Sequence, residues 1–304
     1  MKFYDEINGV DGLMLSSALQ KTIRRGQVSL ALSFAKELIR RGFASHVHKR
    51  LFVYLVEDIG GGNIGLVSLV DKFLLNKIPS ENELLKIVGI FAQSPKNRDV
   101  HNIRVCNKHK LISFDEDLKS VLKGRFCYSI LDIKKLLVAN SSALDEYLDK
   151  EGLFGGKIIQ DNTGKEIYHK ITKQILDISQ YLLKDTDEEI SYSYIRVIKH
   201  IREQQTGFDI YFYLIMFWII KNSNLIQHKP VLQLDFDLSK YDFEKLERIP
   251  DYAIDMHTKK GKILGKTQKD FWLEGGIIEN KIILFEDDIY FNLIMKNLDK
   301  ITNS

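Results

Sequence analysis

Cysteine and proline are both scarce: the chain of 304 residues contains two cysteines and four prolines. Cys106 and Cys127 have no neighbours at the spacing of metal ligands, which excludes the usual paired-cysteine zinc motifs. We expect both to be reduced thiols of a cytoplasmic protein. Because proline interrupts helices, its scarcity is consistent with a mostly helical fold.

Long hydrophobic runs are also absent. Residues 210–220 form an apolar run of 11 residues, whereas a helix needs about 20 to cross a bilayer. A helix that is apolar on every side is normally the buried centre of a bundle, so we favour that interpretation over a dimer contact. The first residues lack the apolar core of a signal peptide. The sequence therefore predicts no membrane partner.

Nucleotide-binding and catalytic motifs are missing as well. No Gly-x-x-x-x-Gly-Lys-Ser/Thr sequence occurs, and in the nearest one, residues 261–267, the glycines are one residue too close. That segment also follows polar residues, not the apolar strand that precedes a phosphate-binding loop. No His-Glu-x-x-His or nucleophile-elbow motif is present. We therefore predict no ATP hydrolysis, no cofactor, no metal site and no catalytic residue.

The first sixty residues do contain a clear helical pattern. Apolar side chains recur at helical spacing over residues 15–26 and again over residues 28–42. Both segments end in Arg-Arg-Gly, which places Gly26 and Gly42 where the chain must turn left-handed. The pattern predicts short helices packed back and forth.

Five short elements follow one another in this region and just beyond it. They are residues 18–24 (Ala-Leu-Gln-Lys-Thr-Ile-Arg), 30–32 (Leu-Ala-Leu), 49–51 (Lys-Arg-Leu), 57–60 (Glu-Asp-Ile-Gly) and 94–97 (Ser-Pro-Lys-Asn). In this order they resemble the C-terminal region of replication-associated recombination protein A, the RarA/MgsA family of clamp-loader-like AAA+ proteins. The last element differs from the family's Pro-Lys-Ser-Asn in the arrangement of serine and asparagine. The resemblance spans roughly residues 14–105.

This resemblance implies an all-helical collar that self-associates, as a tetramer in that family. The family's ATPase module should precede the region, and only thirteen residues do so here. The chain therefore resembles the collar without its motor. DNA and replication proteins are the partners that the resemblance implies.

The chain divides best near residue 150. We predict a RarA/MgsA-like helical collar domain over residues 1–150 and a second, mainly helical domain over residues 151–304. Residues 157–168 contain Asp-Asn-Thr-Gly between two short apolar stretches, which is typical of a small β-hairpin. The predicted fold class is mostly α, with this small β element in the second domain.

The chemically most suggestive stretch is a basic segment, residues 257–272. The net charge is only +3, so positive charge must be clustered to indicate nucleic-acid binding. Five lysines occur without an acidic residue between positions 259 and 269, and two aromatic residues follow. Ammonium groups suit phosphates, and aromatic rings stack on bases. The predicted nucleic-acid-binding residues are Lys259, Lys260, Lys262, Lys266, Lys269 and Trp272.

Two other interpretations of this stretch stay open. Lysine runs are common on protein surfaces, so a solvated helix face, with Phe271 and Trp272 in the core, is the commoner role of such a segment. Asp255 and His257 allow an enzymatic interpretation, since an aspartate can orient an imidazole for proton transfer. A hydrogen-bonding anchor is the commoner role for such a pair.

Glu57 and Asp58 stand at the end of a predicted helix, where carboxylates oppose the helix dipole. We therefore expect basic partners for them on neighbouring helices, from among Arg24, Arg25 and Arg50, and we favour this structural role over a metal site.

Three functions remain open. The first is a non-catalytic, oligomeric accessory protein of DNA replication, recombination or repair that binds DNA, replication proteins or both. The second is a protein-interaction or inhibitor module that acts on a replication complex. The third is an unrecognised enzyme centred on Asp255 and His257. The lysine- and isoleucine-rich composition, without the ATPase module, also favours a phage or another mobile element as the source.

Overall fold

The computed structural model describes most of the first third of the chain and most of residues 229–302. The described residues are 2–7, 9–75, 77–109, 111, 189–190, 193, 196–197, 200, 229–243, 246, 248–279, 281 and 288–302. Within them the secondary structure is helical, with two isolated bridges and no strand. The mostly helical fold class is thus confirmed for this part of the chain. The predicted hairpin at 157–168, the apolar run at 210–220 and the boundary at 150 lie outside it.

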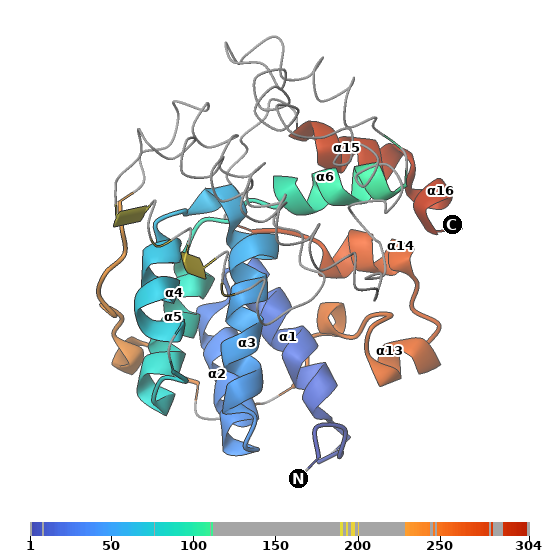
Figure 1. Cartoon of the computed structure of the whole chain (residues 1–304). Helices are drawn as coiled ribbons and strands as arrows, with labels where there is room; N and C mark the ends of the chain where they lie inside the picture. Colours follow the sequence, from blue (N-terminus) through green and yellow to red (C-terminus); the bar gives the residue numbers. More distant parts are fainter. Residues whose placement is uncertain are drawn as a thin grey trace, which may run out of the picture.

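The N-terminal part is a bundle of short helices. Its elements are α1 (Gly12–Arg24), α2 (Val28–Arg40), α3 (Ala44–Tyr54), η1 (Leu55–Ile59), η2 (Gly60–Gly62), α4 (Leu66–Leu74), α5 (Glu81–Gln93) and α6 (Asp99–Lys108). Helices α1, α2 and α3 run side by side, α4 and α5 lie on one side of them, and α6 crosses one end (Figure 1).

The C-terminal part surrounds this bundle with short elements. They are η3 (Leu238–Lys240), η4 (Asp251–Ala253), α13 (Lys259–Ile263), α14 (Gln268–Asp270), η5 (Phe271–Gly275), α15 (Ile289–Lys296) and α16 (Leu298–Thr302). Helices α13 and α14 lie on the side of α1 away from α4 and α5, and α15 packs beside α6 (Figure 1).

The two helices that end in Arg-Arg-Gly form as predicted. Asp11 caps the start of α1, where its carboxylate accepts a hydrogen bond from the Met14 amide at 2.7 Å. At the other ends, Gly26 and Gly42 have φ angles of 69° and 86°. Glycine adopts this left-handed region without strain, so each Arg-Arg-Gly sequence ends one helix and starts the turn to the next.

One hydrophobic core joins the two parts of the molecule. Leu19 and Phe34 of the bundle belong to the same buried cluster as Trp272 and Tyr290 of the C-terminal part. The described residues on the two sides of the predicted domain boundary therefore share a core. Within the part of the chain that the structure describes, no helix is both long and apolar enough to span a membrane.

An extended segment, residues 229–237, runs beside α4 and α5 and depends on a close approach to the backbone. The Val231 amide donates to the Gly65 carbonyl at 3.2 Å. The Phe236 ring, which is 6% exposed, lies on Gly89 of α5, where an added Cβ would come within 2.2 Å of the ring. The missing side chain at position 89 makes the space that the ring fills.

Gly89→Ala should therefore destabilise the protein by about 1–3 kcal/mol, because the added methyl group overlaps the Phe236 ring. In a Phe236→Ala background the overlap is removed. There the same change should stabilise by up to about 1 kcal/mol, since alanine forms helices better than glycine. Urea unfolding of the four variants measures both effects. Destabilisation of equal size in both backgrounds would contradict this account of Gly89.

Candidate functional site

The carboxylate of Asp58 in η1 has no solvent exposure and sits between two arginines. Arg24 Nε lies 2.6 Å from Asp58 Oδ1, and Arg98 Nε lies 3.6 Å from the same oxygen. Gln20 Nε2 donates to Oδ2 at 3.0 Å. Burial by itself raises the pKa of Asp58, but the two guanidinium groups outweigh it and leave the pKa lowered. Asp58 is therefore a buried, charged and well-paired group.

The same two arginines hold the C-terminal part against the bundle. Arg24 Nη1 donates to the Gly275 carbonyl, and Arg98 Nη1 donates to the Gly276 carbonyl at 3.1 Å. A Cβ at position 275 would lie 2.8 Å from Lys21 Cε, so the Lys21 side chain would have to shift to admit it. Burial and the neighbouring Arg24 lower the pKa of Arg98 to about 9. One ionic centre thus fixes η5 relative to α1.

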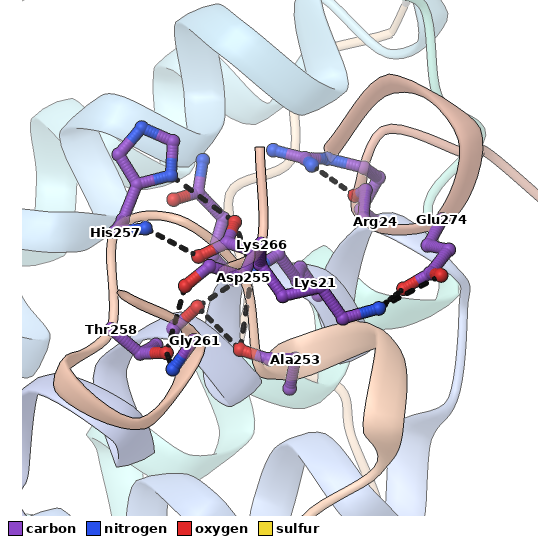
Figure 2. Close-up of polar contacts among 12 residues, drawn as sticks. Lys21, Arg24, Ala253, Asp255, His257, Thr258, Gly261, Lys266 and Glu274 are labelled. Carbon is purple, nitrogen blue, oxygen red and sulfur yellow. Dashed lines mark hydrogen bonds and ion pairs between the residues drawn. The ribbon is translucent and has the colours of Figure 1, made fainter. Parts of the chain in front are cut away.

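A second buried ion pair fixes the segment that leads into α13 (Figure 2). Lys21 Nζ of α1 lies 2.6 Å from Asp255 Oδ2, and both side chains are 4% exposed. Nζ also donates to Ser17 Oγ at 2.7 Å and to the Ala253 carbonyl at 3.3 Å. Burial lowers the pKa of Lys21 to about 8, against the opposing effect of Asp255. Lys21 is therefore charged at neutral pH, with three acceptors for its three hydrogens.

Asp255 also organises the turn that starts α13. Its carboxylate accepts hydrogen bonds from the His257 amide and from Nδ1 at 3.0 and 3.1 Å. The Asp255 carbonyl accepts a hydrogen bond from Thr258 Oγ1 at 2.9 Å. Thr258 Oγ1 in turn caps α13 by accepting a hydrogen bond from the Gly261 amide at 3.0 Å. An added Cβ on Gly261 would lie 1.8 Å from the Asp255 carbonyl. These contacts give α13 a fixed position on the bundle.

The predicted contact between Asp255 and His257 is present, and its surroundings favour an anchor. Asp255 Oδ2 is shared between His257 Nδ1 and Lys21 Nζ. The His257 side chain is 58% exposed and meets Phe271 edge-on, with ring centroids 5.4 Å apart. No serine or cysteine in the described part of the chain is hydrogen-bonded to this imidazole. The Ser17 hydroxyl donates instead to the Ala253 carbonyl.

Helix α13 ends in a turn that leaves two lysines exposed. Gly265 has a φ of 69°. The Lys266 amide donates to the Gly261 carbonyl at 2.9 Å, and the Gly265 amide donates to Lys262 at 3.1 Å, the Schellman pairing of a helix end. These amides are therefore engaged within the turn and do not point at a ligand. Lys260 and Lys262 are exposed, and neither has an ion-pair partner among the described residues.

The other three lysines of the predicted set form ion pairs with acidic side chains. The pairs are Lys259–Glu6, Lys266–Glu274 and Lys269–Asp299, each with an N–O distance of 2.9 Å. Most of these side chains are substantially exposed. Such pairs contribute only about 0–1 kcal/mol each, so a phosphate can replace the carboxylate at little cost. Figure 2 shows the pair formed by Lys266.

Trp272 does not have the place that base stacking requires. Its side chain is 2% exposed, and the guanidinium of Arg98 lies 5.8 Å from its ring centroid. A ring enclosed in the core has no free face for a nucleotide base. The prediction that Trp272 binds nucleic acid is therefore corrected. Trp272 belongs to the core, which is the alternative that the sequence left open.

The sequence indicated only part of these ionic contacts. The expected pairing of Asp58 with Arg24 is confirmed, whereas Arg25 pairs with Glu279 and Arg98 was not anticipated. Lys21 was also missed as the partner of Asp255.

Comparisons with known proteins found no relative of this chain. Neither the family models, nor the curated proteins, nor the solved structures contain a match to the chain. The resemblance to the RarA/MgsA family therefore stays a prediction from the sequence. In the described part of the chain, no group of three or more His, Cys, Asp or Glu side chains is arranged to hold a metal ion.

Lys21→Met should lower the free energy of unfolding by about 3–5 kcal/mol, because it leaves the Asp255 carboxylate buried without its cation. Asp255→Asn should lower the free energy of unfolding by a similar amount, because it leaves the Lys21 ammonium group buried without its anion. The double variant should recover part of the loss, since neither charge is then stranded. Lys266→Met is the control: it breaks a partly exposed pair and should change stability by at most about 1 kcal/mol. Strictly additive effects of the two buried changes in chemical denaturation would contradict the pairing.

The same pair predicts a pH dependence. Burial raises the pKa of Asp255, but hydrogen bonds from His257 and the charge of Lys21 outweigh it and hold the pKa at about 2, against 3.8 for the unperturbed group. Between these values the unfolded chain binds more protons than the folded one, so stability is lost as the pH falls from about 4 to 2. The difference in unfolding free energy between wild type and Asp255→Asn should shrink over that interval. A difference in unfolding free energy that stays constant from about pH 4 to 2 would contradict the lowered pKa of Asp255.

Proposed function

We propose that this protein is a non-catalytic, oligomeric accessory protein of DNA replication, recombination or repair, and that it binds DNA through α13. The observation that carries the proposal is the exposure of Lys260 and Lys262 on a short helix held by buried contacts. Neither ammonium group has a carboxylate partner among the described residues, so both are available to phosphates.

The neighbouring lysines support the same surface. Lys259 precedes the two exposed lysines in α13, and Lys266 follows in the turn. Their carboxylate partners, Glu6 and Glu274, are about half exposed. Phosphate groups can therefore compete for these lysines as DNA approaches. The cluster concentrates positive charge on one surface, whereas the net charge of +3 alone does not indicate where positive charge lies.

The oligomeric part of the proposal rests on the resemblance to the RarA/MgsA collar. Helices α1 to α5 are short and enclose an apolar core, and glycine turns join α1 to α2 and α2 to α3. These features are consistent with a helical collar. The lack of a nucleotide-binding motif in the sequence favours a role without ATP hydrolysis.

Lys260→Gln/Lys262→Gln should weaken binding to a short duplex and lower the slope of log affinity against log salt by about 1.8, since each phosphate contact contributes about 0.9. Fluorescence anisotropy over a range of salt concentrations measures both quantities. The matched control is Lys49→Gln/Lys240→Gln, which removes two exposed lysines from α3 and η3. Its only expected effect is a small uniform weakening.

Equal affinity and slope in the two double variants would contradict DNA binding through α13. Light scattering on the same samples, at tens of micromolar protein, measures the mass of the free and DNA-bound protein. A strictly monomeric mass in both states would contradict the oligomeric part of the proposal. Absence of DNA binding by the wild type would favour the alternative of a protein-interaction module on a replication complex.

A further inference from the structure

The end of α13 exposes two large apolar side chains next to its lysines. Ile263 is 76% exposed and Leu264 is 60% exposed, although most large aliphatic residues of the described chain are buried or half-buried. They follow Lys260 and Lys262 directly in the sequence. Two exposed apolar side chains thus stand beside two exposed lysines in one short segment, which we call the α13 tip (Lys260, Lys262, Ile263 and Leu264).

The turn itself does not require these apolar residues. In a Schellman motif the apolar contact normally joins the residue after the glycine to the residue three positions before the helix cap. Here these positions are Lys266 and Gly261, so the motif is held by backbone hydrogen bonds alone. Ile263 and Leu264 therefore contribute nothing to the helix end, and their exposure to water is unfavourable in the free protein.

The tip is also rigidly supported. Gly261 packs directly on the Asp255 carbonyl, Thr258 caps the helix, and Asp255 is bound to the buried Lys21. A rigid apolar projection can transmit force into a neighbouring molecule, whereas a mobile loop would yield. This arrangement matches proteins that insert apolar wedges between base steps while cationic side chains contact the flanking phosphates.

We propose that the α13 tip is a wedge: Ile263 and Leu264 insert between adjacent base pairs of duplex DNA from the minor groove and kink it. Lys260 and Lys262 contact phosphates on either side of the opened step. This inference rests on the proposed DNA binding and adds a mechanism to it. Charge complementarity selects the occupant, because the lysines are adjacent to the apolar pair and no carboxylate of the described residues pairs with them.

A lipid surface fits the tip less well. Helices that lie on membranes have an apolar face that extends over several turns, whereas α13 has five residues and presents only two apolar side chains at its end. Two side chains are enough to separate one base step. The membrane is therefore an outcome that the experiment must separate from DNA.

The test uses the full chain and a duplex of about 20 base pairs with a dye at each end. Wild-type protein should shorten the distance between the dyes, because the duplex bends, and should unquench 2-aminopurine placed at the opened step. A single mismatch lowers the cost of unstacking. The wild type should therefore bind a mismatched duplex about tenfold more tightly than a perfect one.

Ile263→Ala/Leu264→Ala should abolish the bend, the 2-aminopurine signal and the preference for the mismatch, while the salt slope stays at its wild-type value. The matched control is Leu273→Ala/Ile277→Ala, which removes two other exposed apolar side chains, 47% and 40% exposed. It should leave all four quantities unchanged. Circular dichroism checks that both variants keep their helices.

Bending that persists in Ile263→Ala/Leu264→Ala would overturn the wedge and leave the proposed DNA binding intact. No binding of duplex by the wild type would overturn both. Vesicles with anionic lipid form the last arm of the experiment. Binding to vesicles that depends on Ile263 and Leu264, with no bending of DNA, would overturn the wedge and assign the tip to a membrane surface.

Discussion

The buried carboxylate of Asp58 is the contact on which the arrangement of the molecule depends. It pairs closely with Arg24 and lies within ion-pair distance of Arg98, and these arginines in turn donate to the backbone carbonyls of Gly275 and Gly276. Each group would be costly to bury alone, and removing one would leave the others without compensation. The bundle and the C-terminal part are therefore held together by charge as well as by their shared apolar core.

The ion pair of Lys21 and Asp255 extends the same principle to the surface. Asp255 is buried, yet its backbone and carboxylate define the turn that carries α13 into solvent. The buried Asp255 thus sets the position of the exposed side chains between His257 and Leu264. Local helix propensity could not do this, because a helix of five residues is not stable without tertiary contacts.

The sequence predicted the local features better than the distant ones. The helix ends at Gly26 and Gly42 followed from periodicity and from the conformations open to glycine, and Asp58 was expected to pair with an arginine on a neighbouring helix. The sequence pattern left Trp272 open as a surface or a core residue, since it follows the lysine run but stands beside the aromatic Phe271. The pattern of charge along the chain could not reveal that Lys21 faces Asp255, because that contact depends on how two remote segments pack. The division of the chain at residue 150 stays a prediction.

The distance along the chain between Lys21 and Asp255 has a consequence for synthesis. The two residues are 234 positions apart, so at typical translation rates about 10–50 s separate their emergence from the ribosome. During this interval α1 carries an ammonium group whose final partner does not yet exist, and its surroundings cannot close without leaving that charge uncompensated. The pocket around Lys21 in α1 should therefore stay open to water until the segment that carries Asp255 has been made.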